Sequence, residues 1–423
     1  MASTVKAKKT RLENGARALS ERVTYVDSVS VGVWVGAGSR WEDSSTYGIS
    51  HFIEHMMFKG TEKRSARQIA DEMDSLGGHL NAFTDKEYTC FYAKVLKEHL
   101  PTAINVLSDM ALHSVLDPEE IEREKNVVLE EIKRHQDTPD DLVHDIFAQK
   151  LWQRHPLGNA VIGTRKTVAS LSRENLVSYI ESEYTPDNIV VSAAGNVDHD
   201  ELVGLVSSSL SELSGRRSEN KVHPVHPVKQ TTFTRKSTEQ AHFCMGAPGY
   251  PQSNNDKYVL AIVDSVLGGG MSSRLFQEIR EKRGLVYAIG SYSASYSEAG
   301  LFAVYGGTSM ENLDEVLDLV QKEFVNISKN SVTDAELKRS KNQIRGALVL
   351  GQESMSNRMS RMAKSELYFG RIIPLEVIVG AIMKVSKKDV SRVVGELFSD
   401  SQFALCAVGP FKSSKTKGRQ IRS

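Results

Sequence analysis

The chain has 423 residues, too many for one ordinary hydrophobic core, so we expect two large domains or more. Lysine plus arginine and aspartate plus glutamate each total 53, so the net charge is zero and gives no case for a nucleic-acid partner. A hydrophobic fraction of 40%, with no apolar run of transmembrane length, gives no case for a membrane protein.

The cysteines Cys90, Cys244 and Cys406 are odd in number and far apart, which argues against a disulfide framework and against a cysteine zinc site. The basic N-terminal segment 1–11 lacks the apolar region of a secretory signal and is short for a mitochondrial presequence. We therefore expect a reducing, cytoplasmic location. The basic, polar segment 412–423 is expected to be a disordered tail.

The first strong pattern is a strand in which Val29, Val31, Val33 and Val35 alternate with smaller or more polar residues. Further elements follow in chain order: a helix over 65–76, a hairpin of strands 79–84 and 87–95, a helix over 100–111, a helix that starts at Asp117-Pro118, and a strand over 189–194.

Between the first strand and the first of these helices lies His51-Phe52-Ile53-Glu54-His55. If this stretch is helical, two histidines four residues apart leave the same face, as zinc ligands must. Ser44 to Thr46 offer N-cap hydroxyls upstream, and Gly60 stands where a left-handed cap would end the helix. Glu54 would lean over the metal without binding it, as a general base does. The order H-x-x-E-H is the inverzincin signature.

The motif alone also fits two ordinary surface or core histidines, because catalytic zinc usually has three protein ligands. The helix after Pro118 is rich in glutamate, which is typical of a solvated face. Glu124 and Glu131, however, are seven residues apart and share a face, which Val127 and Val128 make partly apolar. A carboxylate pair on a partly buried face needs a cation.

The order of elements recurs after a polar stretch, at an offset of about 210 residues, which predicts a duplicated domain. We expect an α+β fold of two homologous domains, each an antiparallel sheet with helices mainly on one face. The second copy has no H-x-x-E-H. The predicted division is a metal-binding domain over 1–213, a linker over 214–230, a second domain over 231–411 and the tail 412–423.

In these stretches the chain resembles the M16 metallopeptidases, the family of pitrilysin, insulin-degrading enzyme and the mitochondrial processing peptidase. Residues 51–61 match the family motif with its tail, and residues 122–132 match the helix of the family's distal ligand. The resemblance implies a processing-peptidase-like metallohydrolase fold. It implies one Zn²⁺ per chain held by His51, His55 and Glu131, with Glu124 supporting the site. Glu130 is the alternative ligand if the register differs by one residue.

Other matching stretches imply how a substrate would be held. Asn81, Ala82, Phe83 and Thr84 match the family's edge strand, which pairs with an extended peptide. Arg280 and Tyr287 match a pair that family members place over the scissile carbonyl. The alternative is that Arg280 is an ordinary surface residue and that Tyr287 packs within a strand.

The size resembles that of short, bacterial-type family members that pair as dimers, and the metal residues resemble those of the catalytic β subunit of the processing peptidase. We therefore expect a homodimeric zinc endopeptidase that cleaves extended or unfolded peptides in a closed chamber, with active sites shared between chains, and no nucleic-acid or membrane partner. Glu54 would be the base, and Arg280 with Tyr287 would stabilise the oxyanion. The alternatives are a noncatalytic family member, such as the core subunits of the respiratory cytochrome bc1 complex, and a peptide-binding member.

Overall fold

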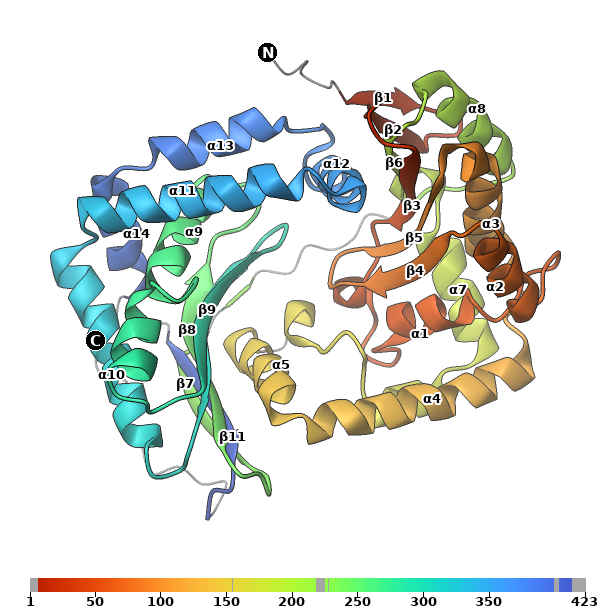
Figure 1. Cartoon of the computed structure of the whole chain (residues 1–423). Helices are drawn as coiled ribbons and strands as arrows, with labels where there is room; N and C mark the ends of the chain where they lie inside the picture. Colours follow the sequence, from red (N-terminus) through yellow and green to blue (C-terminus); the bar gives the residue numbers. More distant parts are fainter. Residues whose placement is uncertain (1–6, 154, 218–224, 227, 399–402, 413–423) are drawn as a thin grey trace. The chain divides into compact units, whose positions relative to one another are not determined.

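The structure is a computed structural model that describes residues 7–153, 155–217, 225–226, 228–398 and 403–412. These residues form two compact units, each built on one β-sheet (Figure 1). The first unit contains 1–132, 159–222 and 351–373, and the second contains 133–158, 223–350 and 374–423. The units therefore differ from the predicted linear division, because 133–158 and 351–373 belong with the opposite half. The tail from 413 and linker residues 218–224 and 227 lie outside the described residues.

The sheet of the first unit has the strand order β1-β2-β6-β3-β5-β4. Its strands are β1 (Lys8–Arg11), β2 (Arg17–Arg22), β3 (Ser28–Val35), β4 (His79–Thr84), β5 (Thr89–Leu96) and β6 (Ile189–Gly195). All neighbouring strands are antiparallel except β2 and β6, which run parallel. The strand β4 ends the order and pairs only with β5 among the described strands.

The sheet of the second unit has the order β7-β11-β8-β10-β9, which repeats the order of β2 to β6 strand for strand. Its strands are β7 (Gln230–Arg235), β8 (Ala241–Gly249), β9 (Ala288–Ser295), β10 (Gly300–Thr308) and β11 (Ala404–Gly409). Here the parallel pair is β7 and β11, which correspond to β2 and β6. The predicted α+β fold of two similar domains is thus confirmed, with one parallel pair added to each antiparallel sheet.

Helices cover the sheets in the same way in both units. The helices are α1 (Ile49–Met56), α2 (Ala66–Ser75), α3 (Leu100–His113), α4 (Pro118–Asp137), α5 (Pro139–Leu151), α6 (Arg165–Ser170), α7 (Arg173–Glu183), α8 (His199–Ser209), α9 (Asp256–Leu267), α10 (Leu313–Asn330), α11 (Asp334–Gly351), α12 (Met355–Phe369), α13 (Leu375–Lys384) and α14 (Lys387–Leu397). In the first unit α1, α3 and α8 share one core with the sheet, and in the second α9, α10 and α14 do. No helix in the described part of the chain is both long and apolar enough to cross a lipid bilayer.

The opposite face of each sheet is covered by a helix from the other half of the chain. This helix lies in 351–373 in the first unit and in 133–158 in the second. In the first unit, Met359 and Met362 of α12 belong to one buried cluster with Trp34 of β3. In the second, Phe147 of α5 packs on the face that carries Cys244 and Cys406. Each sheet is therefore buried on both faces, and each half of the chain supplies one helix to the other half's sheet.

The N-terminus of α1 differs from the one predicted. Its N-cap is Gly48, with no capping side chain, so Ser44 to Thr46 do not cap it. Instead the buried Glu42 carboxylate accepts hydrogen bonds from the N–H groups of Gly48 (2.7 Å) and Ser50 (2.9 Å). An anion at a helix N-terminus satisfies N–H groups that have no partner within the helix. The helix also ends at Met56, four residues before Gly60.

Two glycines allow the backbone to approach closely at this point. Gly48 has φ +94°, and a Cβ on it would lie 2.8 Å from the Cα of Gly163. Gly163 has φ +78°, and a Cβ on it would lie 2.4 Å from the carbonyl oxygen of Tyr47. Only glycine fits such contacts with positive φ. The loop around Gly163 thus fixes where the motif helix begins.

Burial of Glu42 makes the stability of the first unit depend on pH. Burial raises the pKa of Glu42 to about 7, although the N–H bonds from Gly48 and Ser50 oppose this shift. Because the folded pKa lies above the ordinary value, folding takes up a proton between these two pH values. The contribution of protonated Glu42 to the free energy of unfolding is complete below pH about 4.5 and is lost as the pH rises to about 7.

We therefore predict that the free energy of unfolding of the wild type, minus that of Glu42→Gln, falls by about 3 kcal/mol between pH 4.5 and 7. Urea denaturation of the metal-free proteins in EDTA measures this difference. Glu62→Gln, at an exposed glutamate, is the control and should show no such slope. A difference that stays constant with pH would contradict the assignment to Glu42.

Candidate metal centre and active site

Three predicted ligands meet in the first unit. His51 and His55 lie one turn apart on α1, with ring centroids 4.6 Å apart, and Glu131 comes from α4. Glu131 Oε2 lies 3.8 Å from His51 Nε2 and 3.7 Å from His55 Nε2. Among the described residues, this is the one group of three or more potential ligands whose ligand atoms all come within 4.8 Å of one another. Glu130 is exposed and does not belong to it.

The donor set fits a zinc ion. Two imidazole nitrogens and a carboxylate oxygen are the ligands of many catalytic zinc sites, and bond lengths of about 2.0–2.2 Å place tetrahedral ligand atoms about 3.3–3.5 Å apart. The observed 3.7 and 3.8 Å are close to that spacing. Burial, followed by the neighbouring His55, lowers the pKa of His51 to about 4. His51 is therefore neutral at pH 7, the form that binds a metal.

Glu124 holds His55 from behind. Its Oε1 lies 2.8 Å from His55 Nδ1, so the Nε2 atom of His55 is the one left for a metal. Its Oε2 lies 2.5 Å from Lys59 Nζ. Burial alone would raise the pKa of Glu124, but its bonds to His55 and Lys59 lower it overall, so it stays ionised. A carboxylate bound to the second nitrogen of a ligating histidine orients the ring and raises its basicity.

Glu54 is set apart from this arrangement. It lies on α1 between the two histidines, and its Oε2 accepts a hydrogen bond of 2.6 Å from the Thr84 hydroxyl of β4. Burial raises the pKa of Glu54, against the effects of Thr84 and His55. A carboxylate whose pKa is raised toward neutrality is suited to accept and return a proton.

The four residues of the predicted substrate strand alternate in direction. Phe83 packs edge-on against Trp34, and Thr84 points to Glu54 on the other side of the sheet. The Ala82 N–H donates to the Asn81 side chain at 2.8 Å. The side chains of Phe83 and Thr84 are thus engaged within the protein, and the backbone of this edge strand is what they leave for a peptide.

Arg280 and Tyr287 form a pair of their own within the second unit. The Arg280 guanidinium lies 4.6 Å from the ring centre of Phe276 and 5.5 Å from that of Tyr287. Tyr287 is 81% exposed, which is unusual for a strand-packing tyrosine. The alternative in which Tyr287 packs into the core is therefore wrong.

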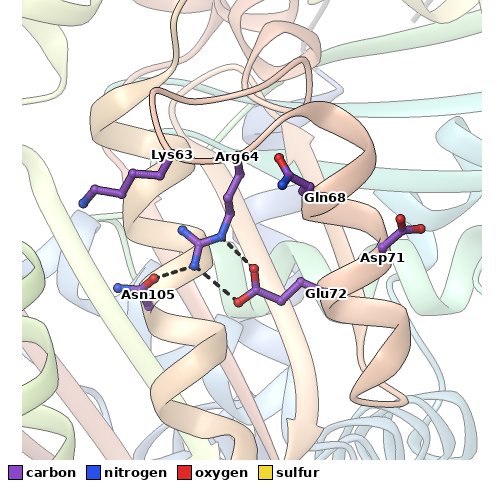
Figure 2. Close-up of a pocket in the computed structure, with 6 residues that line it drawn as sticks. All are labelled: Lys63, Arg64, Gln68, Asp71, Glu72 and Asn105. Atoms are coloured by element: carbon purple, nitrogen blue, oxygen red, sulfur yellow. Dashed lines mark hydrogen bonds and ion pairs between the residues drawn. The ribbon is translucent and has the colours of Figure 1, made fainter.

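A cavity of about 400 Å³ lies elsewhere in the first unit and contains none of the predicted site residues. It is lined by Lys63, Arg64, Gln68, Asp71, Glu72 and Asn105 (Figure 2). Arg64 bonds Glu72 and Asn105 there, at 2.7 Å each, and also bonds the buried Asp109 at 2.8 Å. These bonds attach the segment after the motif helix to α3. The polar residues that line the cavity therefore have a structural role.

Sequence reasoning missed three contributions to this site. Glu42 caps α1, Lys59 pairs with Glu124, and the Thr84 hydroxyl binds Glu54, the predicted base. Lys59 had no usable signal, because it lies beyond the end of α1 and its partner Glu124 is on α4. Glu42 had none, since a single acidic residue in a loop carries no pattern.

Comparison with known proteins identifies the family of the chain. The model of the insulinase family, peptidase family M16, matches residues 17–165, and that of the M16 inactive domain matches residues 170–344. An uncharacterized zinc protease of Bacillus subtilis, YmxG, is 42% identical over 400 residues, which cover 94% of this chain and 97% of that protein. An uncharacterized zinc protease of Mycobacterium tuberculosis, Rv2782c, is 38% identical over 100% of this chain and 97% of its own.

Solved structures share the fold. A peptidase M16 inactive domain from Pseudomonas fluorescens superposes with a TM-score of 0.90 at 19% identity, covering 97% of this chain and 99% of that one. A protease from Helicobacter pylori superposes with a TM-score of 0.89 at 21% identity, over 96% and 100% of the two chains. With a relative of 42% identity matched over almost its full length, the chain belongs to the M16 peptidase family.

Proposed function

We propose that the protein is a zinc-dependent endopeptidase that hydrolyses extended or unfolded peptides. The observation that carries the proposal is the convergence of His51, His55 and Glu131 beside Glu54. His51, His55 and Glu131 would hold the ion, and bound zinc would supply Lewis-acid activation of a water molecule. The zinc protease names of the similar proteins support the metal and the reaction class.

Glu54 is the proposed general base. It takes a proton from the attacking water and returns it to the leaving amine. The raised pKa of its buried carboxyl group favours this two-way transfer. The edge strand β4 would bind the peptide through backbone hydrogen bonds, a mode that selects extended chain more than sequence. The Asn81 side chain, which now accepts from the Ala82 N–H, would give way to a peptide carbonyl.

The proposed oxyanion donors are Arg280 and Tyr287 of a second chain in a homodimer. The exposure of Tyr287 and the guanidinium beside its ring support a role in which the hydroxyl faces a partner or substrate. In the long family members that the chain resembles, the corresponding pair comes from the last of four domains and faces zinc in the first. Two copies of a two-domain chain rebuild that order by closing on each other, which gives two shared sites.

The first prediction concerns the base. Glu54→Gln should keep its zinc, because Glu54 is not a ligand, and should lose at least about 10²-fold in peptide hydrolysis. Elemental analysis and a quenched fluorescent peptide measure the two quantities. Loss of zinc from this variant would count against the assignment. Full zinc occupancy in a wild type that turns over no peptide would favour the peptide-binding alternative instead.

The second prediction concerns the third ligand. Glu131→Gln should weaken zinc binding by at least about 100-fold, the upper end of the losses caused by supporting residues. Glu130→Gln is the matched control one residue away and should bind zinc as the wild type does. Competition with a chromogenic chelator measures both affinities. The reverse outcome would move the ligand to Glu130.

The third prediction concerns the shared site. Homodimers of Glu54→Gln and of Tyr287→Phe should each be nearly inactive. In a mixed dimer one site carries both changes and the other carries neither, so activity should recover toward half that of a wild-type dimer. Two affinity tags isolate the mixed species after subunit exchange. If isolated mixed dimers show no recovery, Tyr287 acts within its own chain or has no part in the reaction.

A further inference from the structure

The Thr84 hydroxyl makes one strong contact, and it is with the proposed base. Its oxygen lies 2.6 Å from Glu54 Oε2, and because a carboxylate can only accept, Thr84 is the donor. Sequence reasoning assigned Thr84 to the substrate strand, where the peptide backbone does the binding. The side chain, however, points to the α1 side of the sheet and meets Glu54.

Thr84 is itself held in place by the hairpin. It pairs across the strands with Thr89, which is 1% exposed and whose hydroxyl donates to the Ala37 carbonyl at 2.9 Å. The Thr89 hydroxyl lies 3.4 Å from the Thr84 hydroxyl. The β-branched Thr84 side chain also has restricted rotamers in a strand. The donor that faces Glu54 is therefore fixed by backbone pairing and by burial.

We propose that Thr84 is a positioning residue for Glu54. By binding Oε2, its hydroxyl fixes the rotation of the carboxylate and leaves Oε1 as the oxygen that exchanges a proton with water. An unheld carboxylate would sample several rotamers, and a base must sit within hydrogen-bond reach of the proton that it takes. This inference rests on the proposed role of Glu54.

A purely structural role is the alternative to exclude. In the second unit, which has no H-x-x-E-H, Ser291 of β9 donates to Asp264 of α9 at 2.5 Å. A hydrogen bond of this kind can therefore have a purely structural role, in which it attaches a helix to an edge strand. A structural tie would change stability and substrate binding, whereas a positioning role would change the rate of the chemical step.

The test uses Thr84→Val, which keeps the branched shape and strand preference of threonine but removes the hydroxyl. We expect kcat to fall about 10- to 100-fold, the loss that corresponds to one hydrogen bond to a charged group, while KM and zinc content stay close to those of the wild type. Thr84→Ser restores the hydroxyl and should recover most of the rate. Thr89→Val, the cross-strand neighbour that does not touch Glu54, is the control for lost stability.

Two further measurements separate the possible failures. In a Glu54→Gln background, Thr84→Val should lower the remaining rate by less than about 2-fold, because the group it positions is already gone. Thermal unfolding of the metal-free variants should show similar losses for Thr84→Val and Thr89→Val. If Thr84→Val raises KM with kcat unchanged, or if Thr89→Val slows kcat equally, the positioning role is overturned. If Glu54→Gln itself keeps full activity, the proposed function fails first.

Discussion

The site depends on one buried carboxylate, Glu124, held between two partners from another helix. Moving an unpaired carboxylate out of water costs several kcal/mol, so a side chain that is 5% exposed must find donors. Both of its donors, His55 and Lys59, come from the motif helix and the turn after it. The pairing therefore fixes α4 against α1. Glu131, two turns or about 10 Å further along α4, is then carried to the Nε2 side of the imidazoles.

Helical spacing explains how far the sequence could predict this centre. The spacing of four residues places His51 and His55 on one face, and the spacing of seven places Glu124 and Glu131 on another. Periodicity within a helix says nothing about which helix lies opposite, so the meeting of α1 and α4 came only from the resemblance to a family. Lys59 and the Thr84 hydroxyl act across elements in the same way, and no pattern within either element reveals them.

The sheets show a similar limit. Strand β3 was predicted because its valines alternate, and the hairpin of β4 and β5 because a turn separates two runs. The parallel pairs were missed, because β2 and β7 carry few apolar residues in alternation. The sequence pattern did not predict the boundaries of the two units either. Helix α12 binds β2 through Arg358 and Arg361, which both bond Glu21, a contact between segments more than three hundred residues apart.

The environment, and not the residue type, separates the roles of the two central glutamates. Burial raises the pKa of Glu54, and its single hydroxyl donor opposes this only in part. Burial acts in the same direction on Glu124, but the bond to His55 and the charge of Lys59 outweigh it and lower the pKa. The first carboxylate thus suits the proposed role of a base, and the second stays ionised behind His55, a proposed metal ligand. Two groups of the same chemistry whose pKa values are driven apart in this way are the arrangement that acid–base catalysis needs.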